Sequence, residues 1–170
     1  MWVVNGFFHI KRKADGSTER YKARLIAKGF HQQPNIDYGE NFSLVIKPVT
    51  IRTILSLTVA SNWDIRQLDV TNTFLHGVIS EDVYMTQPPG FVHSSYPNHV
   101  CHLQKALYGL KQAPRAWFSR LSTYLLQLGF HGSKSDTSLF IYQTQIDMIF
   151  FLIYVDDIIV TRPNFSSSLL

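Results

Sequence analysis

The pair Asp156-Asp157 interrupts an apolar stretch near the end of the chain, and this constrains the fold more than any other sequence feature. Met148–Val155 is a run of eight residues without a charged side chain. A membrane-spanning helix needs about 20 apolar residues, so a buried β-strand is the better interpretation. Ile158–Thr161 has the composition of a second strand. The short connection between the two strands predicts a tight hairpin whose tip carries both aspartates.

Two adjacent carboxylates at such a tip allow two interpretations. Burying paired negative charges is costly unless something compensates them, and a divalent cation is a natural compensation. The alternative is a simple turn, because aspartate is a favoured turn residue.

Asp69 also stands at the end of an apolar strand, in Gln67–Val70. If the strands are neighbours, Asp69 and Asp156 can face each other across two magnesium ions, which prefer oxygen ligands.

The rest of the chain mixes strands and helices without regular β-α-β alternation, which favours an α+β fold. Asp15-Gly16 lies between two β-prone segments and predicts a hairpin. Thr50 predicts the N-cap of a helix that ends near Asn62, and Pro114 fits the first turn of a second helix. Further strands are expected at residues 65–70, 83–85, 139–142 and 146–155, with a loop at residues 86–99.

Composition excludes several classes of protein. The 170 residues are 45% hydrophobic and 16% charged, which excludes a disordered chain. A single cysteine, Cys101, excludes an internal disulfide framework and a cysteine-built zinc site, and favours an intracellular protein. The formal charge is +4, and seven of the 16 Lys and Arg residues lie between Lys11 and Lys28. This cluster indicates either a polyanionic partner or a solvated surface hairpin.

Five sequence blocks occur together and in order, and they carry a family resemblance. The blocks are RYKARLIAKGF (20–30), QLDVTNTFLHG (67–77), VYMTQPPGF (83–91), LYGLKQAPRAW (107–117) and YVDD (154–157). They resemble the reverse transcriptase of copia-type long-terminal-repeat retrotransposons, with a plant-like character. The resemblance covers about residues 10–161, preceded by an atypical lead-in at residues 1–9. A Ser-rich tail follows at residues 162–170, where we expect disorder.

The resemblance implies a partial right-hand polymerase, with fingers and palm subdomains and an antiparallel palm sheet packed on helices. It implies that the thumb and the ribonuclease H domain of a complete enzyme are missing, so that the chain alone is weak or inactive. It also implies that a primer 3′-hydroxyl attacks the α-phosphate of a deoxynucleotide on an RNA or DNA template. Further partners would be the remainder of the Pol polyprotein, in a cytoplasmic virus-like particle or in the nucleus and not at a membrane.

The resemblance assigns roles to individual residues. Asp69, Asp156 and Asp157 match the catalytic carboxylates, and with the backbone carbonyl of Val70 they would hold two Mg²⁺ ions, or Mn²⁺. Phe74 matches the aromatic residue that excludes a ribose 2′-hydroxyl, although its residue type alone favours an ordinary core side chain. The remaining nucleotide-binding candidates are Lys22, Arg24, Tyr108 and Gly109, and the nucleic-acid-binding candidates are Lys28, Lys111, Arg115 and Tyr154. For the basic residues, a solvated face is the alternative.

The sequence departs from the family pattern at Thr73, where alanine is usual, and at Arg162-Pro163, where a turn containing glycine is usual. Two other functions stay open beside a polymerase. One is a degenerate or domesticated remnant that at most binds nucleic acid, motivated by the basic segment 11–28. The other is a small metal-dependent hydrolase, for which the sequence offers no nucleophile or base.

Overall fold

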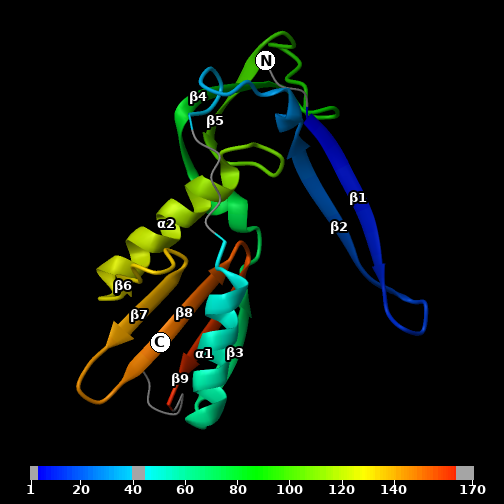
Figure 1. The fold of residues 1–170 in the computed structure, drawn as a ribbon. Helices are drawn as coiled ribbons and strands as arrows, with labels where there is room; N and C mark the ends of the chain where they lie inside the picture. Colours follow the sequence, from blue (N-terminus) through cyan, green and yellow to red (C-terminus); the bar gives the residue numbers. More distant parts are fainter. Residues whose placement is uncertain (1–3, 40–44, 164–170) are drawn as a thin grey trace. The chain divides into compact units, whose positions relative to one another are not determined.

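The computed structural model describes residues 4–39 and 45–163. The chain divides into two compact units, and the first of them comprises Met1–Phe42 with Phe74–Trp117. The second unit comprises Ser43–Thr73 with Phe118–Leu170. Figure 1 shows the elements along the chain.

The second unit is built on a five-stranded antiparallel sheet in the order β3-β9-β8-β7-β6 (Figure 1). Its strands and its helix are α1 Pro48–Ala60, β3 Asp64–Asp69, β6 His131–Gly132, β7 Leu139–Gln143, β8 Met148–Tyr154 and β9 Asp157–Arg162. The hairpin of β8 and β9 is central, and both strands are buried along most of their length. This confirms the prediction of two buried strands on either side of the Asp156-Asp157 pair.

Alternate residues of the sheet enter two hydrophobic cores, one on each face. On one face, Phe151, Ile153 and Val160 pack with Leu121 and Leu125 of α2. That helix runs Ala113–Gln127, and its residues from Phe118 onward belong to this unit. On the other face, Leu152, Leu139 and Ile159 pack with Ile51 and Ile54 of α1. Because helices cover both faces, apolar residues fill β8 and β9 without the polar alternation of a half-exposed strand.

Helix α1 begins earlier than its sequence indicated. It starts at Pro48 with Lys47 as N-cap, so the prediction of Thr50 as N-cap is wrong. The Asp136 carboxylate, which is remote in sequence, accepts hydrogen bonds from the Lys47 N–H (2.9 Å) and the Thr50 hydroxyl (2.7 Å). Burial acts to raise the pKa of Asp136, but the hydrogen bonds from Thr50, Lys47 and Ser138 and the Lys47 charge together lower it. A tertiary contact therefore replaces the local cap.

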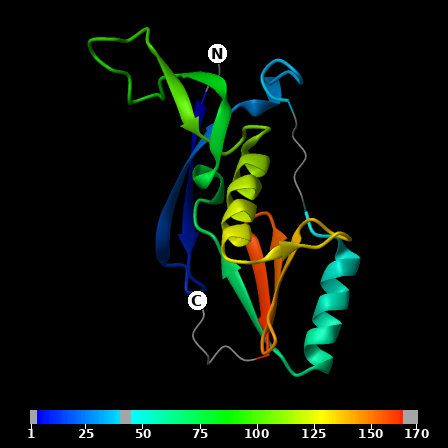
Figure 2. The same ribbon diagram turned by 90° about the vertical axis from the view of Figure 1, so that its left-hand side faces the viewer.

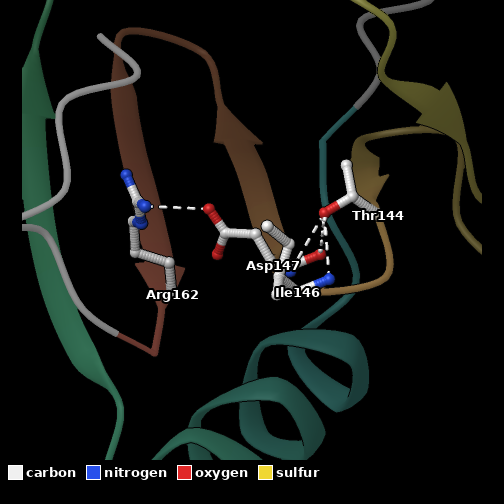
Figure 3. A network of polar contacts seen from close by, with 4 residues as sticks. All are labelled: Thr144, Ile146, Asp147 and Arg162. Atoms are coloured by element: carbon white, nitrogen blue, oxygen red, sulfur yellow. Dashed lines mark hydrogen bonds and ion pairs between the residues drawn. The ribbon is translucent and has the colours of Figure 1, made fainter.

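The far end of β9 is fixed by an ion pair. Arg162, which is 2% exposed, donates to the Asp147 carboxylate at 2.8 Å. Figure 3 shows this pair beside Thr144, whose hydroxyl oxygen accepts the backbone N–H of Asp147 at 3.0 Å. Asp147 lies in the turn between β7 and β8, where its carboxylate is the counter-ion of Arg162. The sequence indicated that the last strand ended at Thr161, but β9 continues to Arg162.

The first unit contains two separate antiparallel hairpins. Its elements are β1 Val4–Arg12, β2 Thr18–Ala27, η1 Gly29–His31, β4 Val78–Thr86 and β5 Val100–Lys105. In the short helix η2 (Thr73–His76), Thr73 belongs to the second unit and the residues from Phe74 onward belong to the first. Figure 2 shows β1 and β2 as a long, two-stranded ribbon. The predicted Asp15-Gly16 hairpin and the loop between β4 and β5 are confirmed, while β4 is longer than the predicted 83–85 strand.

A small core holds the first unit together. Ala27, Ile79 and Val83 pack with Ala106 and Leu110. Trp117 is buried as well, with 7% exposure. A buried amide pair adds to this core, because the Gln32 side chain donates to Gln112 at 3.0 Å. The residue that follows η1 is thereby joined to the segment that precedes α2.

Antiparallel sheets with a few helices agree with the expected α+β class. Helices of the described residues are all too short or too polar to cross a membrane. The division into lead-in, polymerase part and tail stays a prediction, and tail residues 164–170 lie outside the described residues.

Candidate functional site

The turn between β8 and β9 carries the most distinctive backbone of the second unit. Tyr154 pairs with Asp157 across the hairpin, so the two turn residues are Val155 and Asp156. The sequence placed both aspartates at the tip, whereas Asp157 is the first residue of β9. Val155 has a φ of 59°, which is a rare conformation for a β-branched residue and costs about 1–3 kcal/mol. Such strain is most often found at functional sites.

Asp69 lies directly opposite Asp157 in the ladder of β3 and β9. Residues opposite each other in an antiparallel pair lie on the same face, so their two carboxylates are neighbours. The backbone N–H of Val70, which follows Asp69, donates to the Asp156 carbonyl at 3.2 Å. The register therefore brings Asp69, Val70, Asp156 and Asp157 to one end of the sheet. The two strands are neighbours, as the sequence left conditional, but the residue opposite Asp69 is Asp157 and not Asp156.

Strand β3 differs from its prediction in one respect. The sequence indicated an apolar strand, but β3 forms the edge of the sheet, and its apolar residues Ile65 and Leu68 are 46% and 43% exposed. Asp69, Asp156 and Asp157 are exposed as well. Their negative charge is thus hydrated and costs little in the absence of a counter-ion. Gln67, two residues before Asp69, donates to the Asp157 carboxylate at 3.1 Å and fixes that side chain.

The donors at this end of the sheet are of the kind that magnesium selects. Three carboxylates and the carbonyl oxygen of Val70 are all hard oxygen ligands. Within residues 4–39 and 45–163, no group of three or more His, Cys, Asp or Glu side chains is closely enough gathered to hold a metal ion. The donor chemistry at this end of the sheet therefore suits Mg²⁺, whereas the carboxylate side chains, as oriented in this structure, do not converge on one point.

A second cluster of predicted residues lies in the first unit. The Arg24 guanidinium lies over the Tyr108 ring, 5.3 Å from its centroid. Phe74 meets the same ring edge-to-face, with 5.1 Å between centroids. Tyr108 is fixed by backbone contacts, because its carbonyl accepts the Ala27 N–H at 2.8 Å. Three of the five predicted nucleotide-binding residues thus form one stack of a cation and two aromatic rings.

Gly109 makes this stack possible. Its φ is 91°, and a Cβ at this position would collide with the Ala27 carbonyl. A Cβ on Gly29 would in turn collide with the carbonyl of Gly109. Only glycine lets the two backbones approach this closely, so the functional candidate Gly109 also has a structural reason to be glycine.

Comparison with known proteins identifies the family of the chain. The sequence profile described as "Reverse transcriptase (RNA-dependent DNA polymerase)" matches residues 2–167. The chain belongs to this reverse transcriptase family. It is 56% identical over 154 residues to the "Retrovirus-related Pol polyprotein from transposon RE1" of Arabidopsis thaliana, covering 91% of this chain and 10% of that protein. It is 42% identical over 164 residues to the corresponding polyprotein from transposon TNT 1-94 of Nicotiana tabacum, covering 96% of this chain and 12% of that protein.

The likeness extends to yeast, and it concerns one part of much longer proteins. The chain is 30% identical over 167 residues to the "Transposon Ty1-BL Gag-Pol polyprotein" of Saccharomyces cerevisiae, covering 98% of this chain and 9% of that protein. It thus spans about a tenth of the length of the curated relatives that it matches. No solved structure matches the chain. The resemblance to copia-type and plant sequences is confirmed.

The other candidate residues of this reverse transcriptase chain lie outside the two clusters. Lys22 lies two residues before Arg24 and on the same face of β2. Lys28 lies beyond the strand, because β2 ends at Ala27 and Lys28 directly precedes η1. Lys111 and Arg115 are exposed, the latter on the first turn of α2, and Tyr154 ends β8 with 51% exposure.

Sequence reasoning missed one residue beside the carboxylates. Thr73 was noted as a departure from the family and was given no role. Its side chain is buried, with 1% exposure, and its hydroxyl donates to the Val70 carbonyl at 2.6 Å. The spacing of three residues from Val70 to Thr73 is the signal that could have indicated this contact, because Thr hydroxyls often bond to nearby backbone carbonyls.

Proposed function

We propose that this chain carries the catalytic part of an RNA-directed DNA polymerase of a copia-type retrotransposon, joining deoxynucleotides to a primer 3′-hydroxyl. The observation that carries the proposal is the backbone placement of the three acids: Asp69 pairs with Asp157, and the N–H of Val70 donates to the Asp156 carbonyl at the same end of the sheet. The strained turn at Val155 supports it, because the fold maintains this costly conformation next to the carboxylates.

The carboxylates would act by holding divalent cations. Asp69 and Asp156, with the Val70 carbonyl, would hold two Mg²⁺ ions, and Mn²⁺ has the same donor preference. When bound, such a pair of ions stabilises the attacking hydroxyl and the leaving pyrophosphate. Asp157, held by Gln67, would add negative charge and orient its neighbours. In this reaction the hydroxyl oxygen bonds to the α-phosphorus while the bond to pyrophosphate breaks.

The first unit would bind the nucleotide. Arg24 and Lys22 supply positive charge for a triphosphate, and the Tyr108 ring holds the guanidinium of Arg24 in place. Phe74 is half-buried and rigidly packed on Tyr108, which suits a ring that leaves no space for a ribose 2′-hydroxyl. In this proposal the β1-β2 hairpin belongs to the fingers and the five-stranded sheet to the palm.

Template and primer would be held through their phosphates. Lys28, Lys111 and Arg115 are the candidates, and contacts of this kind carry no sequence preference. Tyr154, exposed beside the catalytic turn, would contact the primer. The remainder of the Pol polyprotein would act with this chain in the cytoplasm or the nucleus.

Primer extension on poly(rA)–oligo(dT) with dTTP and Mg²⁺ tests the proposal. We expect weak extension by the wild-type chain, in keeping with the low activity that the resemblance implies for this part of the enzyme alone. Asp156→Asn and Asp69→Asn should reduce extension by roughly 10³-fold or more, since each removes a charge on which metal-assisted transfer depends. Asp82→Asn is the matched control, because Asp82 is an exposed acid of β4 with an 82% exposed side chain. Equal extension by Asp156→Asn and wild type would refute the proposal.

The same samples separate the other two functions. Salt-dependent binding of RNA or DNA that Asp156→Asn leaves unchanged, without extension, would favour the non-enzymatic remnant; the basic β1-β2 hairpin is the observation that supports it. Metal-dependent phosphodiester hydrolysis without extension would favour the hydrolase.

A further inference from the structure

The backbone of Val70 is held at both of its polar groups. Its N–H donates to the Asp156 carbonyl at 3.2 Å, which joins it to the β8-β9 turn. Its carbonyl accepts the Thr73 hydroxyl at 2.6 Å, which is a short hydrogen bond. Val70 is thus fixed between the turn that carries Asp156 and the buried residue that begins η2.

We propose that Thr73 is a positioning residue for the metal site: its hydroxyl orients the Val70 carbonyl as a metal ligand. This inference rests on the proposed function, because it takes the Val70 carbonyl as part of the magnesium site. Thr73 does not touch the metal or the nucleotide in this proposal. It acts through the carbonyl alone.

The local backbone explains why a side chain makes this contact. Asn72 has a φ of 57°, a left-handed conformation that reverses the chain directly before Thr73. The reversal brings the Thr73 hydroxyl back to the carbonyl three residues earlier. With 1% exposure, Thr73 has no access to solvent, so its hydroxyl has this carbonyl as its acceptor in place of water.

A carbonyl oxygen has two lone pairs, and Thr73 uses one of them. The second stays available to a cation while the hydrogen bond restricts the rotation of the peptide plane. Groups that orient a metal ligand in this way change metal affinity by about 10–100-fold when they are removed. The family's usual alanine has no such group, so the hydroxyl is a property of this chain.

Titration of Mn²⁺ into the nucleic-acid-free chain, followed by electron paramagnetic resonance, tests the inference without relying on activity. We expect Thr73→Val to weaken Mn²⁺ binding about tenfold, since valine keeps the shape and removes the donor. Thr73→Ser, which keeps the hydroxyl, should bind within about threefold of wild type. Should Thr73→Val be too unstable to titrate, Thr73→Ala carries the same expectation.

Thr58→Val is the matched control for a structural effect. Thr58 is also a buried threonine of the second unit, with 0% exposure, and its hydroxyl donates to the Ile54 carbonyl at 2.8 Å. Its loss should lower the unfolding temperature and leave the Mn²⁺ affinity unchanged. An equal loss of affinity in Thr58→Val and Thr73→Val would overturn the inference by showing a general effect of destabilisation.

Two results distinguish failure of this inference from failure of the proposed function. If wild type binds Mn²⁺ and Asp156→Asn does not, the metal site stands. Unchanged or tighter binding by Thr73→Val then overturns the role of Thr73 alone. If wild type shows no Mn²⁺ binding that depends on Asp156, the metal site of the proposed function fails, and the role of Thr73 fails with it.

Discussion

Two hairpins of this chain hold charged candidate residues, and the two are packed in opposite ways. In the β8-β9 hairpin both faces are covered, Ile153 and Ile158 are 1% and 2% exposed, and the acids stand only at the end. In the β1-β2 hairpin, Phe8 and Tyr21 are 80% and 79% exposed, and cations follow its length. Figure 1 shows the first within a sheet and the second as a lone ribbon.

The difference lies in what fixes the charged groups. At β8-β9, buried strands on both sides fix the backbone, so the carboxylates hold their places even though their side chains are exposed. At β1-β2, the register places Lys11 opposite Arg20. Like charges opposite each other destabilise a strand pair, and a bound polyanion would relieve that repulsion. The acidic hairpin is thus organised by its own core, whereas the basic hairpin holds like charges opposite each other on exposed strands.

The largest expected effect separates the two hairpins by their packing. Phe151→Ala in β8 should lower the free energy of unfolding by about 3–5 kcal/mol, because it removes a buried ring from the core. Phe8→Ala in β1 should change it by no more than about 0.5 kcal/mol, as for an exposed residue. Urea denaturation of both variants measures the difference. A loss as large in Phe8→Ala as in Phe151→Ala would show that β1 has a covered face.

The sequence was sufficient for the parts of the fold that local patterns determine. The apolar run of residues 148–155 and the Asp15-Gly16 turn predicted both hairpins, because strand composition and turn residues act over a few neighbours. Local patterns did not predict the contacts that residues make with distant parts of the chain. Asp136 caps α1 from 89 residues away, and Arg162 draws Asp147 out of solvent. Neither contact leaves a local signal.

In the candidate site, too, local sequence patterns predicted some features and missed others. The motifs predicted Asp69, Asp156 and Asp157, and the register brings them together. The one-residue displacement of the turn was not predictable, because a positive φ at Val155 contradicts the preference of valine. The stack of Arg24 on Tyr108 was missed as a contact, since it joins β2 to a segment more than 80 residues away. Resemblance named these residues, but the structure shows how they are held.

A smaller effect concerns Asp136, which stabilises the sheet and helix around the acidic hairpin. Asp136→Asn should lower the free energy of unfolding by about 1–2 kcal/mol at pH 7, as loss of a helix cap does. Because the folded-state pKa of Asp136 is lowered, its contribution is present above the unfolded-state pKa. It is lost as the pH falls through the folded-state pKa. Urea denaturation between pH 7 and pH 3 should therefore show the two proteins converging in acid.

Asp15→Asn is the matched control, from the β1-β2 turn. Asp15 also accepts from a hydroxyl and a backbone N–H, both of Ser17, and these hydrogen bonds lower its pKa. It is fully exposed, so solvent replaces those bonds when they are lost, and its substitution should change stability much less than that of Asp136. If Asp15→Asn matches Asp136→Asn in size and pH dependence, burial is not what distinguishes the two regions.

The smallest expected effect tests how the basic hairpin presents its charge. Arg24→Lys keeps the positive charge and loses the planar group that stacks on Tyr108. We expect the affinity for dTTP to fall about threefold, which corresponds to a cation–π contact of about 0.7 kcal/mol. Arg20→Lys, at an exposed position of the same strand, should leave it unchanged. Equilibrium binding of dTTP with Mg²⁺ measures both affinities.

If Arg20→Lys weakens binding as much as Arg24→Lys, the positive charge of the hairpin acts as a diffuse field. In that case the stack on Tyr108 would order Arg24 without contributing to dTTP binding. The two hairpins would then differ fully, because a fixed backbone position would matter for function only at the carboxylates.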